Sequence, residues 1–132
     1  MILHIKKYEY PLIFIFGGVI YMIIELLWRG RTHWTMGLCA GVCFVQLYLL
    51  EKYMSNLKLI TKCIIGTTII TLNEFITGCI VNLSLGWAVW DYSETPLNLF
   101  GQVCLVFSLL WFILCIPTFK LARKIKGLFS AN

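Results

Sequence analysis

The chain has 132 residues, enough for about one domain, and it is 60% hydrophobic, 15% aromatic and only 13% charged, with a mean hydropathy of +0.85. A soluble domain carries about a quarter charged residues, so this composition excludes an ordinary soluble enzyme, a coiled coil and a disordered chain. The net charge of +5 does not indicate nucleic-acid binding, because most Lys and Arg residues lie at the ends of apolar runs, where membrane topology explains them.

Four apolar runs follow one another along the chain. The first contains a single charged residue and covers residues 11–28, close to the roughly 20 residues that cross about 30 Å of hydrocarbon. The others predict spans over about 35–51, 63–85 and 97–119. Because no run alternates as the strands of a membrane barrel would, the sequence predicts an all-α integral membrane protein with four transmembrane helices in two helical hairpins, forming a single transmembrane domain over 1–132.

A basic, amphipathic tail follows the fourth span, over residues 120–132. Its apolar residues recur at helical spacing among four cations, which predicts a segment lying along the anionic lipids of the inner leaflet. Docking onto a cytoplasmic partner is the alternative. The apolar residues of the tail are Leu121, Ile125, Leu128 and Phe129.

The distribution of Lys and Arg predicts the orientation. Nine of the eleven lie in the N-terminal segment, in the connection between the second and third spans, and in the tail, whereas the other side has only Arg29 and Arg31. Positive charge concentrates on the cytoplasmic side. We therefore expect an inner (cytoplasmic) membrane protein with both termini in the cytoplasm.

Acidic residues concentrate on the opposite side, where four of the six lie: Glu25, Glu74, Asp91 and Glu94. An ionisable group inside a span is costly and is by default a functional hypothesis. Arg29 follows Glu25 by four residues, in the favourable acid-before-base order on one helix face. The spacing therefore predicts a Glu25–Arg29 pair on a stripe that faces protein.

The third span carries a similar polar stripe around Glu74, with Gly78 and Asn82 at following steps of four. No basic residue lies within one turn of Glu74. Desolvation raises a carboxyl pKa, so Glu74 is either protonated or paired across helices with Arg29 or Arg31.

The two outer connections are short and rich in polar and aromatic residues. Tryptophan at such positions is typical of the interfacial aromatic belt, but a plain helical turn has no need of the Arg, His and Asp residues among them. Asn98 and Gln102 are expected on one polar face of the fourth span. The candidate substrate-binding residues are Glu25, Arg29, Arg31, His33, Trp34, Glu74, Asn82, Trp90, Asp91, Tyr92, Ser93, Asn98 and Gln102.

Motifs for other chemistry do not occur in the sequence. The six cysteines fall inside predicted spans without a zinc-type spacing, and buried thiols in such positions behave as small apolar residues. There is no phosphate-binding loop. The sequence therefore predicts no metal site and no catalytic residue, and it identifies no cofactor.

Three segments within roughly residues 12–115 carry a resemblance to a known family: GGVIYMIIELLWRGRTHWTMGLCAG, NEFITGCIVN and WDYSETPLNLFGQVCLVFSLLW. In these segments the chain resembles a family of bacterial membrane proteins called "putative ABC-transporter type IV", or CmpB-like permeases. The resemblance implies transport, and it raises a separate ATPase or another membrane subunit as a partner.

Together these features predict a permease for a small polar or ionic solute, bound by the carboxylate, Arg and His residues of the outer half of the bilayer. Four carboxylates face two guanidiniums there, which favours a cationic solute or proton coupling. Four helices enclose little space, so we expect a homo-oligomer. The alternatives are a membrane-embedded enzyme acting on a lipid-linked substrate at the outer leaflet, and a non-catalytic accessory or scaffold subunit.

Overall fold

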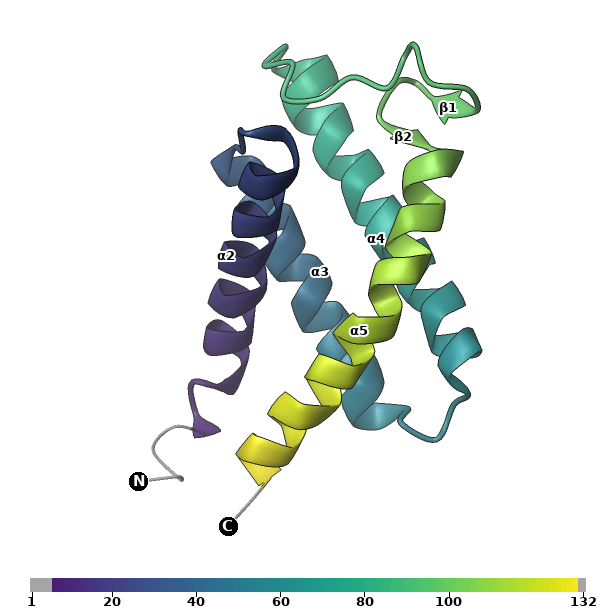
Figure 1. The fold of residues 1–132 in the computed structure, drawn as a ribbon. Coiled ribbons are helices and arrows are strands. Elements are labelled where there is room, and N and C mark those ends of the chain that lie inside the picture. Colours follow the sequence, from purple (N-terminus) through teal and green to yellow (C-terminus); the bar gives the residue numbers. More distant parts are fainter. Residues whose placement is uncertain (1–5, 131–132) are drawn as a thin grey trace. The chain divides into compact units, whose positions relative to one another are not determined.

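The computed structural model describes residues 6–130 and contains four long helices (Figure 1). They are α2 (Glu9–Arg29), α3 (Trp34–Tyr53), α4 (Leu59–Gly78), which continues as the π-helical turn η1 (Cys79–Ser84), and α5 (Leu105–Ser130). Each is long and apolar enough to cross a membrane. Two short strands, β1 (Asn98–Leu99) and β2 (Val103–Cys104), pair antiparallel. The predicted all-α membrane fold with four spanning helices is confirmed.

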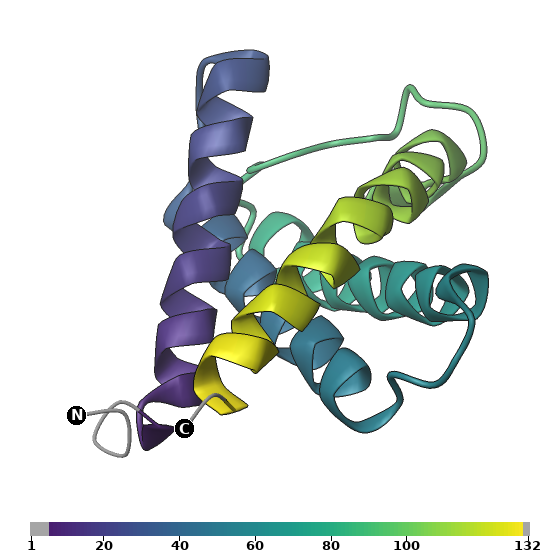
Figure 2. The ribbon, with the colours of Figure 1, turned by 60° about the horizontal axis from the view of Figure 1, so that its bottom comes forward.

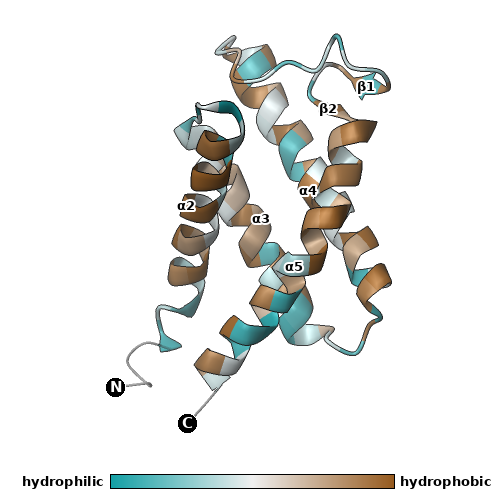
Figure 3. Ribbon diagram, in the orientation of Figure 1, coloured by the Kyte–Doolittle hydropathy of each residue, from teal (hydrophilic) through white to brown (hydrophobic). Residues whose placement is uncertain are grey.

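The helices expose the apolar side chains that a membrane protein presents to lipid. On α2, Leu27 is 83% exposed and Ile15 is 58% exposed, and Figure 3 shows hydrophobic colour along much of α2 and the first part of α5. A soluble monomer rarely exposes so large an apolar area. The four helices therefore belong to a multi-pass membrane protein.

The chain divides into two compact units. The first consists of the chain up to Leu57 and from Pro117 onward, and the second consists of Lys58–Ile116. Helix α5 is continuous across the division (Figure 2), with Pro117 inside it. The prediction of a single transmembrane domain stays a prediction.

In the first unit, α2 and α3 form an antiparallel hairpin whose backbones approach closely. A Cβ on Gly18 would lie 2.7 Å from the carbonyl oxygen of Gly37, and one on Gly41 would lie 2.8 Å from that of Phe14. Small residues permit such contact between membrane helices. Van der Waals contact between the two backbones thus stabilises the hairpin in addition to side-chain packing.

The last turns of α5 complete the first unit. Ala122 is buried with Ile13, Phe44 and Tyr48. Three apolar residues of the tail pack against this cluster: Leu121, Ile125 and Phe129. The predicted tail is therefore the end of α5 and packs on the hairpin, while Leu128 is 74% exposed. Residues 131–132 of the tail lie outside the described residues, and its binding to anionic lipids stays a prediction.

Polar contacts join the helix ends of the first unit at its side nearest the chain termini. Buried Glu9 accepts hydrogen bonds from the hydroxyl of Tyr48 and, at 3.3 Å, from Lys52. Buried Glu51 accepts a hydrogen bond of 2.9 Å from Arg123. A buried carboxylate requires such partners, and these contacts connect α2 with α3 and α3 with α5.

In the second unit, polar side chains connect α4 with the first half of α5. The hydroxyls of Thr71 and Ser108 are 3.1 Å apart. The expectation that the fourth helix begins at about residue 97 is wrong, because the helix begins at Leu105. Leu97 and Phe100 have φ angles of 55° and 54°, a left-handed conformation that interrupts a helix.

Candidate functional site

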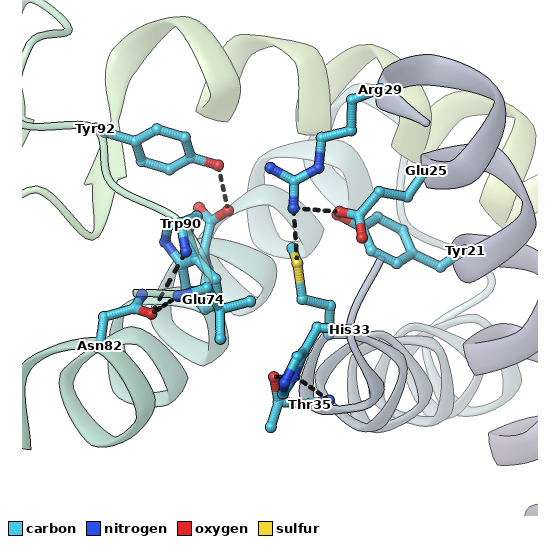
Figure 4. Close-up of polar contacts among 11 residues, drawn as sticks. Tyr21, Glu25, Arg29, His33, Thr35, Glu74, Asn82, Trp90 and Tyr92 are labelled. Atoms are coloured by element: carbon cyan, nitrogen blue, oxygen red, sulfur yellow. Dashed lines mark hydrogen bonds and ion pairs between the residues drawn. The ribbon is translucent and has the colours of Figure 1, made fainter. Parts of the chain in front are cut away.

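Glu25 forms the centre of a small polar group in the first unit. Its side chain is buried, with 6% exposed. One oxygen, Oε2, lies 3.3 Å from Arg29 Nη2 and accepts a hydrogen bond of 3.2 Å from the Tyr21 hydroxyl (Figure 4). The predicted Glu25–Arg29 pair is confirmed. The other oxygen, Oε1, is buried and has no hydrogen-bond partner within residues 6–130.

The other predicted residues of this unit lie in the connection from α2 to α3. His33 is the N-cap of α3, where its Nδ1 accepts a hydrogen bond of 3.3 Å from the backbone N–H of Thr35 and lies 2.6 Å from the Thr35 hydroxyl. Trp34 is 57% exposed and stacks on the His33 ring. Arg31 is exposed. The structure therefore explains His33 as a helix cap, whereas Arg31 faces away from the core of the unit.

Glu74 is the buried carboxylate of the second unit, with 6% exposed. Its Oε2 accepts a hydrogen bond of 3.2 Å from the Tyr92 hydroxyl, and its Oε1 accepts one of 3.3 Å from the indole N–H of Trp111. Tyr92 is held in place by stacking on Phe107, with ring centroids 4.8 Å apart. Two neutral donors from distant parts of the chain thus converge on one carboxyl group.

Asn82 organises the connection between η1 and α5. Its Oδ1 accepts hydrogen bonds from the backbone N–H groups of Val89 at 2.7 Å and Trp90 at 3.4 Å (Figure 4). Its Nδ2 donates to Gln102 Oε1 at 2.8 Å. The Trp90 indole donates to the backbone oxygen of Gln102 at 2.9 Å. Because Trp90 and Gln102 are both buried, these bonds satisfy groups that water does not reach.

Gly78 allows this connection to lie against α4. A Cβ at this position would lie 2.5 Å from Gln102 Oε1 and 3.0 Å from the ring of Trp90. Any larger residue would therefore displace both side chains. Gly78 is the point at which Gln102 and Trp90 meet the helix that carries Glu74.

Exposed Asp91 and Ser93 and half-buried Asn98 belong to the same connection. Asp91 Oδ1 accepts a hydrogen bond of 2.9 Å from the backbone N–H of Ser93. This bond and the Ser93 side chain hold the pKa of the Asp91 carboxyl below its usual value. Asn98 Nδ2 donates to the backbone oxygens of Thr95 at 2.9 Å and Ser93 at 3.3 Å, and its Oδ1 accepts from Gly101 N–H. These residues stabilise a turn.

The structure distributes the predicted site residues between the two units. Glu25, Arg29, Arg31, His33 and Trp34 belong to the first, and the others belong to the second. The expected polar face on the fourth span is wrong, because Asn98 lies on β1 and Gln102 precedes β2, outside α5. Asn98 bonds backbone groups of its own turn, which competes with helix formation.

Sequence reasoning missed two contacts. Trp111 lies in an apolar run, but an indole N–H inside a membrane span needs an acceptor, and this need is a signal that the sequence contains. Met36, whose sulfur lies 3.3 Å from Arg29 Nη2, carries no such signal, because a methionine in a span is typical of packing. Within residues 6–130, no group of three or more His, Cys, Asp or Glu side chains could hold a metal ion.

Comparisons with known proteins agree with the resemblance inferred from the sequence. The chain matches the family described as "Putative ABC-transporter type IV" over residues 10–130, which cover the four spanning helices except for Glu9 and include both buried carboxylates of the candidate site. No curated protein and no solved structure matches it. Since the match covers nearly the whole chain, the protein belongs to the putative ABC-transporter type IV family of membrane proteins.

Proposed function

We propose that the protein is a permease subunit that moves a small polar solute, with Glu25 and Glu74 as its two ligand-binding or proton-binding carboxylates. The family and the four spanning helices support a membrane transport role. Placing an ionisable group inside a membrane helix costs a few kcal/mol of free energy. Two such groups in one short chain therefore support a functional role for both. Each carboxylate forms a separate centre in its own unit.

One observation carries the proposal, namely the buried oxygen Oε1 of Glu25. A buried acceptor left without a hydrogen bond costs about 1–3 kcal/mol, and more when it is charged. Arg29 and Tyr21 both use the other oxygen. A cation, a proton or a hydrogen-bond donor of a solute would satisfy Oε1, and the pairing with Arg29 would keep the site from carrying a full uncompensated charge.

Glu74 supports the same function through a different set of partners. The Tyr92 and Trp111 donors can stabilise an ionised carboxylate, and neither of them carries a charge of its own. A solute or proton that competes with them would exchange one partner for another. The Glu74 centre is thus suited to reversible binding.

The finer features of the proposal come from the sequence. They are a cationic solute or proton coupling, an inner-membrane location with both termini in the cytoplasm, a homo-oligomeric assembly, and a separate ATPase or other membrane subunit as partner. The nine-to-two distribution of Lys and Arg supports the orientation, and the family description supports a partner subunit.

A scaffold subunit is the second candidate, and the second unit supplies an observation in its favour. Asn82, Gln102 and Trp90 satisfy one another's polar groups, and the turn around Asn98 does the same with its own backbone. Fully satisfied buried networks rigidify a fold. In that case these residues hold α4, the connection and α5 together, and the polar cluster needs no solute.

The test begins with binding by the purified protein in detergent. Thermal unfolding is measured with sodium, potassium, ammonium, choline and putrescine chlorides at constant ionic strength, balanced with N-methylglucamine. We expect one of these cations to raise the unfolding midpoint of the wild type. Glu25→Gln should abolish that rise, because the amide keeps the size of the side chain and removes its charge. Glu94→Gln, an exposed position, serves as the matched control.

Flux measurements then separate transport from scaffolding. In proteoliposomes, the cation that stabilises the protein, or protons followed with trapped pyranine, should move across the membrane with wild type and Glu94→Gln. Glu25→Gln and Glu74→Gln should each lower that flux while the protein stays folded. If no probe moves, and if both variants change only the unfolding midpoint, the transport proposal fails and the scaffold role is favoured.

A further inference from the structure

The connection between η1 and α5 is unusually long and apolar for a turn between two consecutive spanning helices. Helix–helix connections in bundles have about 2–8 residues, whereas this one runs from Leu85 to Cys104. Three of its side chains are largely exposed: Leu97 at 75%, Leu99 at 51% and Phe100 at 71%. Exposed apolar residues gathered on one short hairpin indicate a contact surface.

The contacts of this connection with α4 give a measure of its depth. Trp90 and Gln102 meet α4 at Gly78, sixteen residues beyond Lys62. At about 1.5 Å per residue this is about 24 Å along the helix, and the hydrocarbon layer is about 30 Å thick. Measured from Lys62, the contact lies inside the far boundary of the hydrocarbon. Measured from Lys58, at the start of α4, it lies at that boundary, about 30 Å away.

The length of α5 leads to the same depth for the hairpin. The uncharged part of α5, from Leu105 to Phe119, rises by only about 22 Å. Counted as far as Arg123, which pairs with Glu51, the rise is about 28 Å, and any tilt reduces the thickness that it covers. Strand β2 leads directly into the first turn of α5, with β1 beside it (Figure 1). This rise leaves part of the thickness of the hydrocarbon layer for the hairpin that precedes α5.

Several backbone groups of the hairpin are hydrogen-bonded within it, and such bonds lower the cost of irregular structure at membrane depth. Asn98 pairs with Cys104 and Leu99 with Val103 in the β1–β2 ladder. Gln102 donates from its backbone N–H to Leu99 O at 3.1 Å and from its side chain to Phe100 O at 2.9 Å. These bonds close the turn around Phe100 and satisfy backbone polar groups that lipid cannot.

We propose that residues 97–104 form a re-entrant hairpin whose apolar tip lies among the acyl chains of the bilayer. The tip consists of Leu97, Leu99 and Phe100, and its exposed surface continues along the lipid-facing side of α5 at Leu105 and Leu109. Asp91 and Glu94 stay at the aqueous surface. The occupant of this surface is lipid, and the inference does not depend on whether the protein transports a solute.

The first test is photocrosslinking in nanodiscs of phosphatidylethanolamine and phosphatidylglycerol. The photoreactive residue p-benzoylphenylalanine replaces Phe100 in one variant, Glu94 in a second and Leu109 in a third. After irradiation, mass spectrometry should find lipid adducts at positions 100 and 109 and several-fold fewer at position 94. Adducts at position 100 that are as rare as those at position 94, or that join a second copy of the chain, would overturn the proposal.

A second test uses the unmodified protein, so it does not depend on the folding of a variant. Hydroxyl radicals generated in water oxidise exposed side chains in nanodiscs, and each rate is divided by the rate in the unfolded chain. Phe100 and Leu97 should be protected as strongly as Leu109 and several-fold more than Met54, which lies in the connection from α3 to α4. Equal oxidation of Phe100 and Met54 would show that the hairpin tip is in water and would contradict the proposal.

Discussion

The Glu25 and Glu74 centres contain the same group, a buried carboxylate in a membrane helix. Their partners differ in how far away they lie along the sequence. Glu25 pairs with Tyr21 and Arg29, each four residues away on its own helix. Glu74 accepts hydrogen bonds from Tyr92 and Trp111, which are 18 and 37 residues away. The first arrangement exists as soon as α2 forms, whereas the second requires the whole of the second unit. We therefore expect substitutions around Glu74 to affect stability more than those around Glu25.

The largest expected effect is that of Gly78→Leu. The added side chain would collide with Gln102 and Trp90, and overpacking a tight contact costs about 1–3 kcal/mol, occasionally more. Thermal unfolding in detergent should show a marked drop in midpoint, with exposure of Trp90 to a fluorescence quencher. Gly127→Ala, at a position with open space around it, is the control and should leave the midpoint unchanged or slightly raised. A tolerated Gly78→Leu would contradict the close packing described for the second unit.

Removal of either donor to Glu74 should have the next largest effect. Hydrogen bonds to charged groups contribute about 1.5–3 kcal/mol, so Trp111→Phe and Tyr92→Phe should each destabilise the protein by about that amount. Because both donors serve one carboxyl group, the double variant should differ from the sum of the single variants. A double-mutant cycle by chemical denaturation measures that coupling. Strict additivity would mean that the two donors act independently.

Glu25→Gln should cost less stability. The i,i+4 pair with Arg29 contributes about 0.3–0.5 kcal/mol when exposed, the Arg29 side chain is 29% exposed, and the amide oxygen can still accept from Tyr21. We expect a loss of about 1 kcal/mol or less in chemical denaturation. A loss of unfolding free energy as large as that of Trp111→Phe would contradict the proposed difference in stability between the Glu25 and Glu74 centres.

The smallest expected effect concerns the pH dependence of Asp91. Its pKa is lowered in the folded protein by the hydrogen bonds from Ser93. A carboxyl group with a lowered pKa stabilises the fold above its unfolded pKa of about 3.9, and this contribution is lost as the pH falls through the folded pKa. NMR titration of ¹³C-labelled aspartate should show a midpoint below that of the unfolded chain. In Ser93→Gly, which keeps the backbone N–H, the midpoint should rise only partly. A midpoint at or above the unfolded value would exclude the turn described here.

The comparison also indicates which parts of the site could be predicted from sequence. Spacing of four residues was enough to predict the Glu25–Arg29 pair, because a helix places such residues on one face. No spacing rule connects Glu74 with Trp111, and the predicted choice between protonation and pairing with Arg29 or Arg31 did not include a neutral tryptophan donor. Asn98 and Gln102 were singled out correctly as polar residues and placed on the wrong element, because hydropathy does not distinguish an apolar hairpin from the first turns of an apolar helix.

Composition and hydropathy by themselves determined that this is a membrane protein with four spanning helices, because the cost of placing backbone polar groups in lipid leaves an apolar chain few alternatives. Local spacing determined the Glu25 centre, because the fixed helical repeat places residues four apart on one face. Only the tertiary structure decided that residues 97–104 form a hairpin, that the tail packs on α2 and α3, and that Tyr92 and Trp111 converge on Glu74. Those features depend on contacts between residues far apart in sequence, which no periodic pattern records.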